Sequence, residues 1–581
     1  MPTPSTSGLS TRVPAPPAGT AQAGTIVALL PDIAHKWGGV QGEGATVSYS
    51  FAWSQGLAAV FDGPDGQAYS HLHEPDAADH RGLNATEQAA ARAAMALWAD
   101  VANVVFEEVT ETSALVGDIR WAWTSATHSA SDGAKAWGWA GYPSSVWPSA
   151  GDIWLSTQSS AATDSNWSLG SYNLYSLVHE LGHALGLKHP FDDAFQLDAP
   201  QDVRNYTVMS YDDPVASSWV TVSATSAGGY SWSARTVVPS TPMVGDVLAI
   251  QYLYGANTRA NSGDDVYDFD PAVPFYKTLW DTQGHDTLSA ARFAQPCLIN
   301  LNEGTYSSLG YQSNWDQYAK LNWKSVPDTS TFYDGTNNLG IAWGVVIEDA
   351  LGGSGNDTLI GNSANNWLVG AAGDDSLDGG LGDDTLEGDA GNDRLVGGLG
   401  TDTALYTGPR QAFTLAKTST GWRVSDQTGA EGSDTLQGVE RLSFADRHIA
   451  LDLDGHAGAV ARVLGAVVGP GAVSANPALV GIGLYHMDVM GESLQSLMGL
   501  ALRACLGPSP SSGQVVDLLY THVVGRAPDA ATRQHFTDVL DRHQLSPVEL
   551  GVLAAQTEQN AARIDLVGLT QTGLAYLPYS A

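Results

Sequence analysis

The chain has 581 residues, several times the length of a typical domain, so we expect several domains. Acidic residues outnumber lysine and arginine by 62 to 26, which gives a formal net charge of −36 at pH 7. This charge has the wrong sign for binding nucleic acid or an anionic membrane, but it suits a protein that binds many divalent cations. Cys297 and Cys505 are the two cysteines, and their separation argues against a disulfide scaffold or a cysteine metal site.

Residues 1–24 are rich in proline, threonine, serine, alanine and glycine. They lack the basic start and the apolar core of a secretory signal peptide, so we predict a disordered leader or pro-segment. No apolar run reaches the ~18 residues that a transmembrane segment needs.

Residues 25–250 have the pattern of a mixed α/β domain. A helix is expected over residues 84–101, with Asn84 as its N-cap and Glu87 three residues later. Residues 118–123 and 152–155 alternate or run apolar, as strands do. The tryptophan-rich segment 136–142 between them fits an edge strand and a core strand equally well.

Residues 179–189 read His-Glu-Leu-Gly-His-Ala-Leu-Gly-Leu-Lys-His and carry the chemistry. Apolar spacing predicts a helix over 172–185, and His179 and His183, four residues apart, share one of its faces. Gly186 lets the chain leave the helix with positive φ and bring in His189 as a third imidazole. Three neutral histidines leave one coordination position open, which is typical of a catalytic zinc ion.

Glu180 stands beside the first predicted ligand, where it can reach a metal-bound water without binding the metal itself. Zinc lowers the pKa of bound water from ~15.7 to around 7 and polarises a scissile carbonyl. Glu180 would then serve as general base and later as general acid to the leaving amine. A buried helix with incidental histidines would not explain the full spacing of residues 179–189.

Residues 206–211, Tyr-Thr-Val-Met-Ser-Tyr, resemble the Met-turn of the metzincins, and most closely that of the serralysin branch. The resemblance implies that Met209 lies beneath the zinc-binding histidines. It also implies that Tyr211 binds zinc in the resting enzyme and swings away to stabilise the oxyanion. In metzincins the edge strand pairs with an extended peptide substrate, and the resemblance implies this role for residues 136–142.

Residues 352–405 contain six consecutive nine-residue matches to G-G-x-G-x-D-x-U-x, the pattern of the RTX parallel β-roll. The aspartate at position six meets its equivalent two turns later across a calcium ion, with backbone carbonyls completing the shell. Asn366 replaces this aspartate in one turn, so the Asn366/Asp384 site should be weaker. The predicted pairs are Asp357/Asp375, Asp375/Asp393 and Asp384/Asp402.

The segment that joins the peptidase region to the nonapeptide repeats also resembles the serralysins, in residues 247–257, 280–287, 299–304 and 347–353. The resemblance as a whole covers roughly residues 60–405. It implies a further calcium site at the join, whose side-chain ligands, carried over by position, would be Asp265, Asp281, Asp286 and Glu348.

The nonapeptide repeat fades beyond Tyr406, and the pattern becomes helical from about residue 456. Residues 515–529 resemble a helical domain of unknown activity found at the ends of secreted RTX proteins. The predicted fold is therefore multidomain, with an α+β metzincin-like catalytic domain, a parallel β-roll and a mainly helical C-terminal domain. The expected boundaries are 1–24 for the leader, 25–250 for the peptidase, 251–351 for a connecting β region, 352–405 for the roll, 406–455 for a β cap and 456–581 for the helical domain.

The predicted function is a secreted, calcium-dependent zinc endopeptidase with one catalytic Zn²⁺ and several structural Ca²⁺ ions. The alternative is a calcium-binding surface- or matrix-associated RTX protein with little proteolytic activity. Expected partners are protein or peptide substrates, the type I secretion machinery and, as a further candidate, a cell-surface layer or matrix protein. The expected location is extracellular or at the cell surface, after export without an N-terminal signal peptide.

Overall fold

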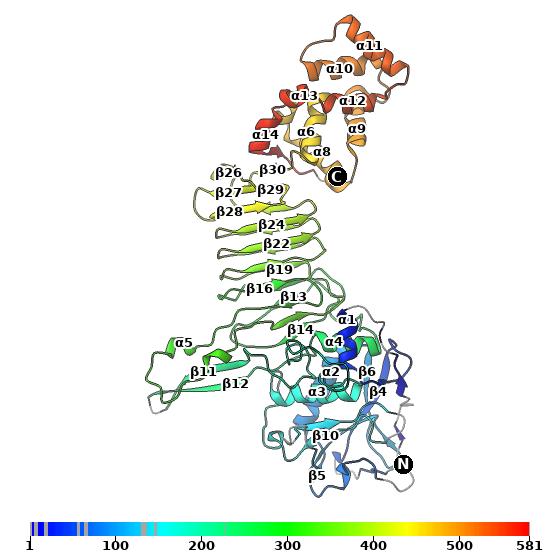
Figure 1. Cartoon of the computed structure of the whole chain (residues 1–581), viewed down its shortest axis with the longest axis vertical. Helices are drawn as coiled ribbons and strands as arrows, with labels where there is room; N and C mark the ends of the chain where they lie inside the picture. The colour runs from blue at the N-terminus through cyan, green and yellow to red at the C-terminus, as the bar shows by residue number, and fades with distance from the viewer. Residues whose placement is uncertain are drawn as a thin grey trace. The chain divides into compact units, whose positions relative to one another are not determined.

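The computed structural model describes residues 3–4, 10–14, 16, 21–54, 59–62, 68–128, 136–144, 148–226 and 228–579. The chain divides into two compact units (Figure 1). One comprises Met1–Leu288 and Arg292–Ile347, and the other comprises Ser289–Ala291 and Glu348–Ala581. No helix among the described residues combines the length and the hydropathy that crossing a membrane requires.

The first unit is built on a mainly parallel sheet with the strand order β6-β4-β8-β10-β9, in which β5 also pairs with β8. Strand β9 is antiparallel to β10 and lies at the end of this order, so residues 136–142 contain an edge strand. The predicted strands at 118–123 and 152–155 are confirmed, within one residue, as β8 and β10. The bounds are β4 Ala45–Phe51, β5 His80–Arg81, β6 Val104–Glu108, β8 Ile119–Thr124, β9 Gly138–Ala140 and β10 Ile153–Ser156.

Two helices of this unit, α2 (Ala85–Val101) and α3 (Tyr172–Leu185), pack against each other. Both were predicted, and the capping box of Asn84 and Glu87 at the start of α2 is confirmed. The indole of Trp98 is completely buried and donates a hydrogen bond to the carbonyl of Val178 at 3.0 Å. This bond joins the two helices beneath the histidine motif.

Part of the expected leader is regular structure, so the prediction of disorder over residues 1–24 is wrong for these segments. Strand β2 (Ser10–Arg12) pairs with β3 (His35–Trp37), and helix α1 (Ala21–Leu29) begins inside the expected leader. Helix α1 buries Leu29 completely, a tertiary contact that composition does not reveal. Thr3–Pro4 form β1 beside β7 (Leu115–Val116). The described residues of the leader are 3–4, 10–14, 16 and 21–24, and its other residues lie outside the described ranges.

The remainder of the first unit includes helix α4 (Val244–Tyr254), the hairpin β11–β12 and several short strands (Figure 1). Trp315 of the short helix α5 packs on the hairpin through Val220 and Val222. The other bounds are α5 Trp315–Tyr318, β11 Ser218–Ala224, β12 Tyr230–Thr236, β13 Val266–Asp268, β14 Lys277–Leu279, β15 Thr287–Ser289, β16 Leu298–Asn300, β17 Tyr306–Ser307 and β18 Leu339–Ile341.

The second unit begins with two stacks of short strands that pair in parallel, each strand with the one eighteen residues further on. Leucines at the eighth repeat position face inward and are completely buried, as in the pairs Leu359↔Leu377 and Leu368↔Leu386. One stack contains β19 Asp349–Leu351, β21 Trp367–Val369, β23 Thr385–Glu387 and β25 Thr403–Leu405. The other contains β20 Thr358–Ile360, β22 Ser376–Leu381 and β24 Arg394–Leu399.

Both stacks continue beyond the nonapeptide repeats. Strand β28 (Ser433–Gln437) pairs in parallel with β24, and β29 (Arg441–Phe444) pairs in parallel with β25. The remaining strands of this unit pair antiparallel with the ends of the stacks, and the last one comes from the C-terminal end of the chain. Their bounds are β26 Phe413–Lys417, β27 Trp422–Asp426, β30 Arg447–Ala450 and β31 Leu574–Tyr576.

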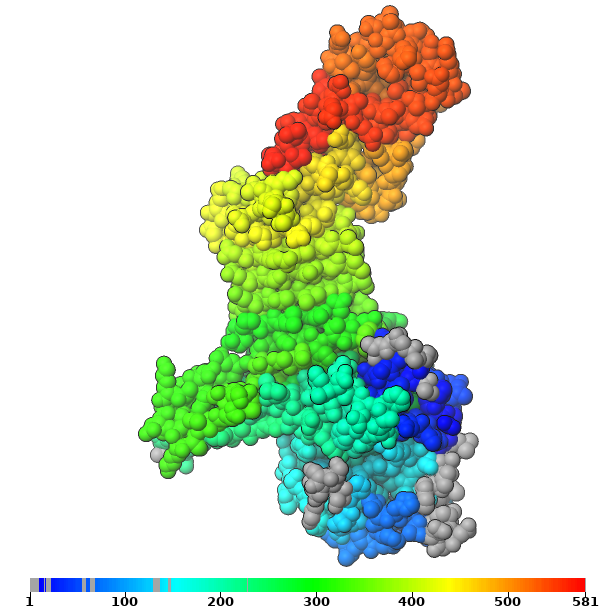
Figure 2. Space-filling view, viewed as in Figure 1, coloured from blue at the N-terminus to red at the C-terminus, as the bar shows by residue number. Residues whose placement is uncertain are grey.

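The predicted helical C-terminal region is confirmed by the structure. Its core surrounds the buried helix α6, against which α8, α9, α10 and α12 pack. Figure 2 shows the strand layers in green to yellow, and the helical residues beyond them run from yellow through orange to red. The bounds are α6 His456–Val467, α7 Pro470–Ala475, α8 Pro477–Leu484, α9 Leu494–Leu506, α10 Ser512–Val524, α11 Ala530–Asp541, α12 Pro547–Ala555, α13 Glu558–Arg563 and α14 Leu566–Thr572, with a π-helix at Tyr485–Val489.

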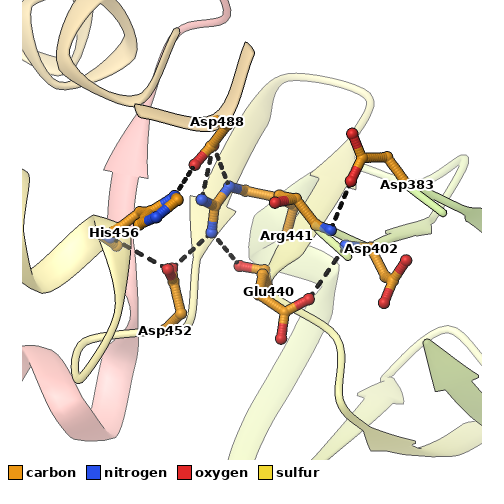
Figure 3. A network of polar contacts seen from close by, with 9 residues as sticks. Asp383, Asp402, Glu440, Arg441, Asp452, His456 and Asp488 are labelled. Carbon is orange, nitrogen blue, oxygen red and sulfur yellow. Dashed lines mark hydrogen bonds and ion pairs between the residues drawn. The ribbon is translucent and has the colours of Figure 1, made fainter. Parts of the chain in front are cut away.

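A buried arginine joins the strand layers to these helices (Figure 3). Arg441 on β29 is 3% exposed and pairs with Asp452 at 2.5 Å and with Asp488 at 2.7 Å. Asp488 also lies 2.8 Å from Nδ1 of His456, at the start of α6. A single guanidinium thus holds acids from both sides of the junction within the second unit.

Candidate metal centre

Helix α3 carries the first two histidines and the glutamate of the motif on one buried face. The side chain of Ser171 caps its first turn by accepting a hydrogen bond from the backbone N–H of Leu174 at 3.2 Å. The helix ends at Gly186, whose φ of 114° confirms the predicted left-handed exit. A Cβ atom on this glycine would lie 2.6 Å from the carbonyl oxygen of His35, so the sharp turn requires glycine here.

The three imidazoles converge. One ring nitrogen from each of His179, His183 and His189 lies within 4.8 Å of the other two, and the Nε2 atoms of His183 and His189 are 3.0 Å apart. The opposite nitrogens are anchored. Nδ1 of His179 lies 2.7 Å from the carbonyl of Val208, and Nδ1 of His183 lies 2.7 Å from the carbonyl of Leu187.

Nδ1 of His189 lies 2.8 Å from a carboxylate oxygen of Asp192. Because a carbonyl or carboxylate accepts the Nδ1 proton in each case, the Nε2 lone pairs are left pointing to a common centre. Burial also lowers the pKa of His183 to about 4 and that of His189 to about 2. Neutral imidazoles are the form that binds a metal, so the donor set fits zinc.

Glu180 is 6% exposed and faces the same cleft as the histidines. Burial raises the pKa of its carboxyl group to about 8. The cleft has a volume of about 410 Å³, and residues 136–140, which include β9, form part of its lining together with Tyr142. The edge strand therefore borders the histidine cluster, which is the position that the resemblance implies for a substrate-pairing strand.

Met209 lies beneath helix α3 and is completely buried. Its sulfur is 2.6 Å from the position that a Cβ atom on Gly182 would occupy, and Trp98 lies 3.3 Å from the same position. Gly182, between the two helical histidines, therefore makes room for the methionine.

Tyr211 lies beside the cluster. Its ring centroid is 4.6 Å from that of His189 and 5.6 Å from that of His179, and the side chain is 47% exposed. This position is compatible with both roles that the resemblance implies, and those roles remain predictions.

Asp246, a completely buried acid on α4, could not be assigned to the site from sequence motifs. Its carboxylate accepts hydrogen bonds from the hydroxyl of Thr207 at 2.6 Å and from the backbone N–H groups of Val208 at 2.7 Å and Met243 at 2.8 Å. Burial raises the pKa of Asp246 to about 7, although these bonds act in the opposite direction. The signal in the sequence was a lone acid at the third position of a mainly apolar helix.

The repeat aspartates form a ladder of hydrogen bonds eighteen residues apart. The backbone N–H of Asp357 donates to Oδ1 of Asp375 at 2.7 Å, that of Asp375 to Asp393 at 2.8 Å, and that of Asp384 to Asp402 at 2.9 Å. The three predicted pairs are therefore neighbours. The second oxygens, Oδ2, of Asp375, Asp384, Asp393 and Asp402 are buried without a hydrogen-bond partner among the described residues.

Buried carboxylate oxygens without partners are costly, and hard cations such as Ca²⁺ prefer oxygen ligands. The donor set therefore fits calcium. Asn366 differs from the aspartates, because its amide nitrogen donates to the carbonyl of Glu348 at 2.8 Å.

The predicted calcium ligands at the join are brought together in part. One carboxylate oxygen from each of Asp265, Asp281 and Asp286 lies within 4.8 Å of the other two, and Asp281 and Asp286 are almost completely buried. The backbone N–H of Asp265 donates to Asp286 at 2.8 Å. Glu348 belongs to the second unit, and its part in this site stays a prediction.

Two family models match the chain. Residues 61–213 match the matrixin family, and residues 351–386 and 370–404 match the RTX calcium-binding nonapeptide repeat. The metalloprotease AprA of Pseudomonas entomophila is 35% identical over 294 residues, which are 46% of this chain and 52% of that protein. The chain is similar to serralysin-type metzincins in its matrixin and repeat regions.

Two serralysins are similar to this chain. That of Photorhabdus luminescens is 33% identical over 300 residues, covering 48% of this chain and 53% of its own length. That of Proteus mirabilis is 30% identical over 367 residues, covering 56% and 61%. The chain spans about half the length of the first curated relatives that it matches.

The matched ranges contain the histidine cluster, Glu180, Tyr211 and the repeat aspartates of this chain. A matrixin domain implies zinc, and RTX repeats imply calcium. The helical region from residue 456 onward lies outside both matched ranges.

Proposed function

We propose that this protein is a secreted, calcium-dependent zinc endopeptidase. The observation that carries the proposal is the convergence of three anchored imidazoles with Glu180 in one cleft bordered by an edge strand. When His179, His183 and His189 bind it, zinc supplies the Lewis acidity that polarises a scissile carbonyl and acidifies water.

Glu180 is the proposed general base. It lies next to His179 on α3 and faces the cleft, so it can reach a water near the three imidazoles without taking a ligand position. The glutamate removes a proton from the attacking water and later delivers it to the leaving amine. Burial helps, because a carboxylate with few competing waters interacts more strongly with the reacting proton.

Tyr211 is the proposed oxyanion donor. Its ring lies against those of His179 and His189, so a small movement brings its hydroxyl to the carbonyl under attack. A donor of this kind is typically worth ~3–4 kcal/mol in the transition state.

The edge strand β9 is the proposed docking site for the substrate backbone. One edge of β9 pairs with β10, and the residues of β9 form part of the lining of the cleft. An extended peptide that adds to such an edge gains main-chain hydrogen bonds whatever its sequence, while neighbouring pockets select side chains. This supports an endopeptidase that acts within extended protein segments.

Calcium binding by the repeats supports a parallel β-roll that folds outside the cell. Submicromolar cytosolic calcium would leave the repeat carboxylates unneutralised, and millimolar calcium would bridge them, so binding free energy becomes folding free energy. We infer export as an unfolded chain through type I secretion machinery. A surface-layer or matrix protein is the further candidate partner.

The competing proposal is a calcium-binding surface or matrix protein with little proteolytic activity. That reading predicts the loss of a histidine or of the glutamate, whereas all four lie together. The deciding experiment compares wild type with Glu180→Gln on an internally quenched peptide, with zinc content measured by elemental analysis. The variant should keep about one zinc per chain and lose ~10²–10⁴-fold in kcat.

Glu107→Gln, an exposed position on β6, makes the same chemical change away from the cleft and should leave kcat unchanged. If the zinc- and calcium-loaded wild type hydrolyses no peptide, the competing proposal replaces ours. If Glu180→Gln keeps full activity, the role of Glu180 is wrong.

A further inference from the structure

We propose that the calcium ladder continues beyond the nonapeptide repeats and ends in two additional sites, one between Asp393 and Asp434 and one between Asp402 and Glu440. The inference rests on the proposed calcium binding by the repeats and extends it to residues 434–440. These residues lie outside both matched ranges of the RTX family model.

The sequence of residues 429–437, Gly-Ala-Glu-Gly-Ser-Asp-Thr-Leu-Gln, fits the repeat pattern except at its second position. Asp434 occupies position six and Leu436 position eight. In the structure Leu436 pairs with Leu395, and it is 3% exposed. Residues 429–437 therefore form a seventh turn, separated from the sixth by a segment that contains the hairpin β26–β27.

An eighth turn follows in shortened form. Leu442 pairs with Ala404 in the position of an inward-facing repeat leucine and is completely buried. Glu440, two residues before it, stands where a repeat aspartate would stand. This alignment places an acid at the calcium position of each additional turn.

Both acids take up the hydrogen-bond ladder of the repeats. The backbone N–H of Asp393 donates to Oδ1 of Asp434 at 3.0 Å, and that of Asp402 donates to Oε2 of Glu440 at 3.0 Å. These pairs are 41 and 38 residues apart along the chain, whereas the pairs within the repeats are 18 apart. The ladder is thus preserved in space although the sequence period is broken.

Each additional pair of acids includes a buried oxygen without a hydrogen-bond partner among the described residues. Oδ2 of Asp393 and Oδ2 of Asp402 have no hydrogen-bond partner among the described residues, and these side chains are 1% and 0% exposed. Two buried carboxylates side by side repel each other, and a divalent cation bound by both removes the repulsion.

The backbone around Asp402 also repeats the geometry of an earlier turn. A Cβ atom on Gly379 would lie 2.3 Å from Oδ2 of Asp384 and 2.5 Å from the carbonyl oxygen of Gly397. A Cβ atom on Gly397 would lie 2.4 Å from Oδ2 of Asp402 and 2.0 Å from the carbonyl oxygen of Gly438.

The carbonyl of Gly438 therefore takes the place of a repeat glycine carbonyl beside the carboxylate. Gly432 also occupies the position of a repeat glycine. A Cβ atom on Gly432 would lie 1.7 Å from the carbonyl oxygen of Gly391, and a Cβ atom on Gly391 would lie 1.8 Å from the carbonyl oxygen of Gly373. Carboxylate and carbonyl oxygens together make an all-oxygen donor set suited to Ca²⁺.

The test measures calcium stoichiometry of the full chain by equilibrium dialysis with radioactive calcium. Asp434→Asn and Glu440→Gln should each bind one ion fewer than wild type. Asp454→Asn removes the same charge at an exposed position and should bind as many as wild type. Asp434→Asn should fold, because Asn366 already occupies the equivalent position in a well-formed turn.

Two results separate this inference from the proposed function. If wild type binds calcium and both variants bind as many ions, the additional sites do not exist, while calcium binding by the repeats stands. If wild type binds no calcium, the proposed calcium dependence itself fails. If a variant loses its folded circular dichroism spectrum, the sites are tested instead by anomalous diffraction from wild-type crystals grown in calcium. Anomalous peaks beside Asp434 and Glu440 would support the two sites, and the absence of these peaks would overturn them.

Discussion

The carboxylate of Asp246 accepts a hydrogen bond from the backbone N–H of Val208 at 2.7 Å. The carbonyl of the same Val208 lies 2.7 Å from Nδ1 of His179. One buried acid on α4 thus fixes the Met-turn, and the Met-turn in turn fixes the tautomer and ring orientation of the first imidazole. Partners of this kind are as much a part of a metal site as the ligands themselves.

Asp246→Asn should weaken zinc binding by ~10–100-fold, the usual cost of losing such a partner. An amide offers one acceptor oxygen where the carboxylate offers two, so one of Thr207, Val208 and Met243 would face an N–H₂ group. The zinc dissociation constant, measured by competition with a chelator, checks this, and saturating zinc should restore much of kcat. Asp100→Asn, on an exposed position of α2, is the matched control. An unchanged zinc affinity would show that Asp246 only stabilises the fold.

Tyr211→Phe should lower kcat far more than it raises KM, because an oxyanion donor acts in the transition state and adds little to substrate binding. The expected loss in kcat is ~10²–10³-fold. Steady-state kinetics on a quenched peptide measures both parameters. Tyr230→Phe removes a hydroxyl from an exposed tyrosine on β12 and should change neither. An equal change in kcat and KM, or no change, would remove Tyr211 from the reaction.

Local spacing explains why much of the site could be predicted. The helix at 172–185 and the left-handed Gly186 follow from patterns within a few residues, whereas the edge position of the strand near residues 136–142 was left open by the sequence. The partners of Asp246 could not be found in this way, because Thr207 and Val208 lie 39 and 38 residues away in the chain. Such contacts exist only after tertiary packing.

The end of the strand stack was missed for a different reason. The period of nine breaks after Leu405, and the hairpin β26–β27 separates Asp434 from the turns that it continues. A search for the repeat pattern alone, without requiring unbroken periodicity, would have found residues 429–437. Glu440 would still have been missed, since its turn is shortened and its acid is a glutamate.

Arg441→Met should loosen the helical region from the strand layers without reducing kcat. Removing the guanidinium leaves Asp452 and Asp488 without their buried partner, and breaking such a pair costs ~3–5 kcal/mol. Hydrogen exchange should rise in α6 and in the π-helix that carries Asp488. Arg394→Met makes the same change on an exposed position of β24 and should leave exchange unaltered. Equal exchange in the two variants would mean that Arg441 does not hold the junction.

Calcium withdrawal should unfold the strand layers of the repeats. Oxygens of Asp375, Asp384, Asp393 and Asp402 are buried without hydrogen-bond partners among the described residues, so the cation-free ladder concentrates uncompensated charge. Each ion contributes ~2.7 kcal/mol of stability when free calcium is a hundredfold above its dissociation constant. Hydrogen exchange of residues 358–399 with and without a chelator measures the loss, and equal protection in both conditions would contradict it.

Substitution of Asn366 by aspartate should add a calcium site, and it provides the matched variant for the calcium-withdrawal experiment. The amide of Asn366 donates to the carbonyl of Glu348 at 2.8 Å, a bond that stabilises the turn without a cation. Asn366→Asp removes that donor and places a second carboxylate beside Asp384, whose Oδ1 accepts from the backbone of residue 366 at 2.8 Å. The variant should be less protected than wild type in chelator, because it adds a buried charge, and should bind one more ion in millimolar calcium. A variant with unchanged stoichiometry and unchanged protection would show that the acid at position six does not determine calcium binding in this turn.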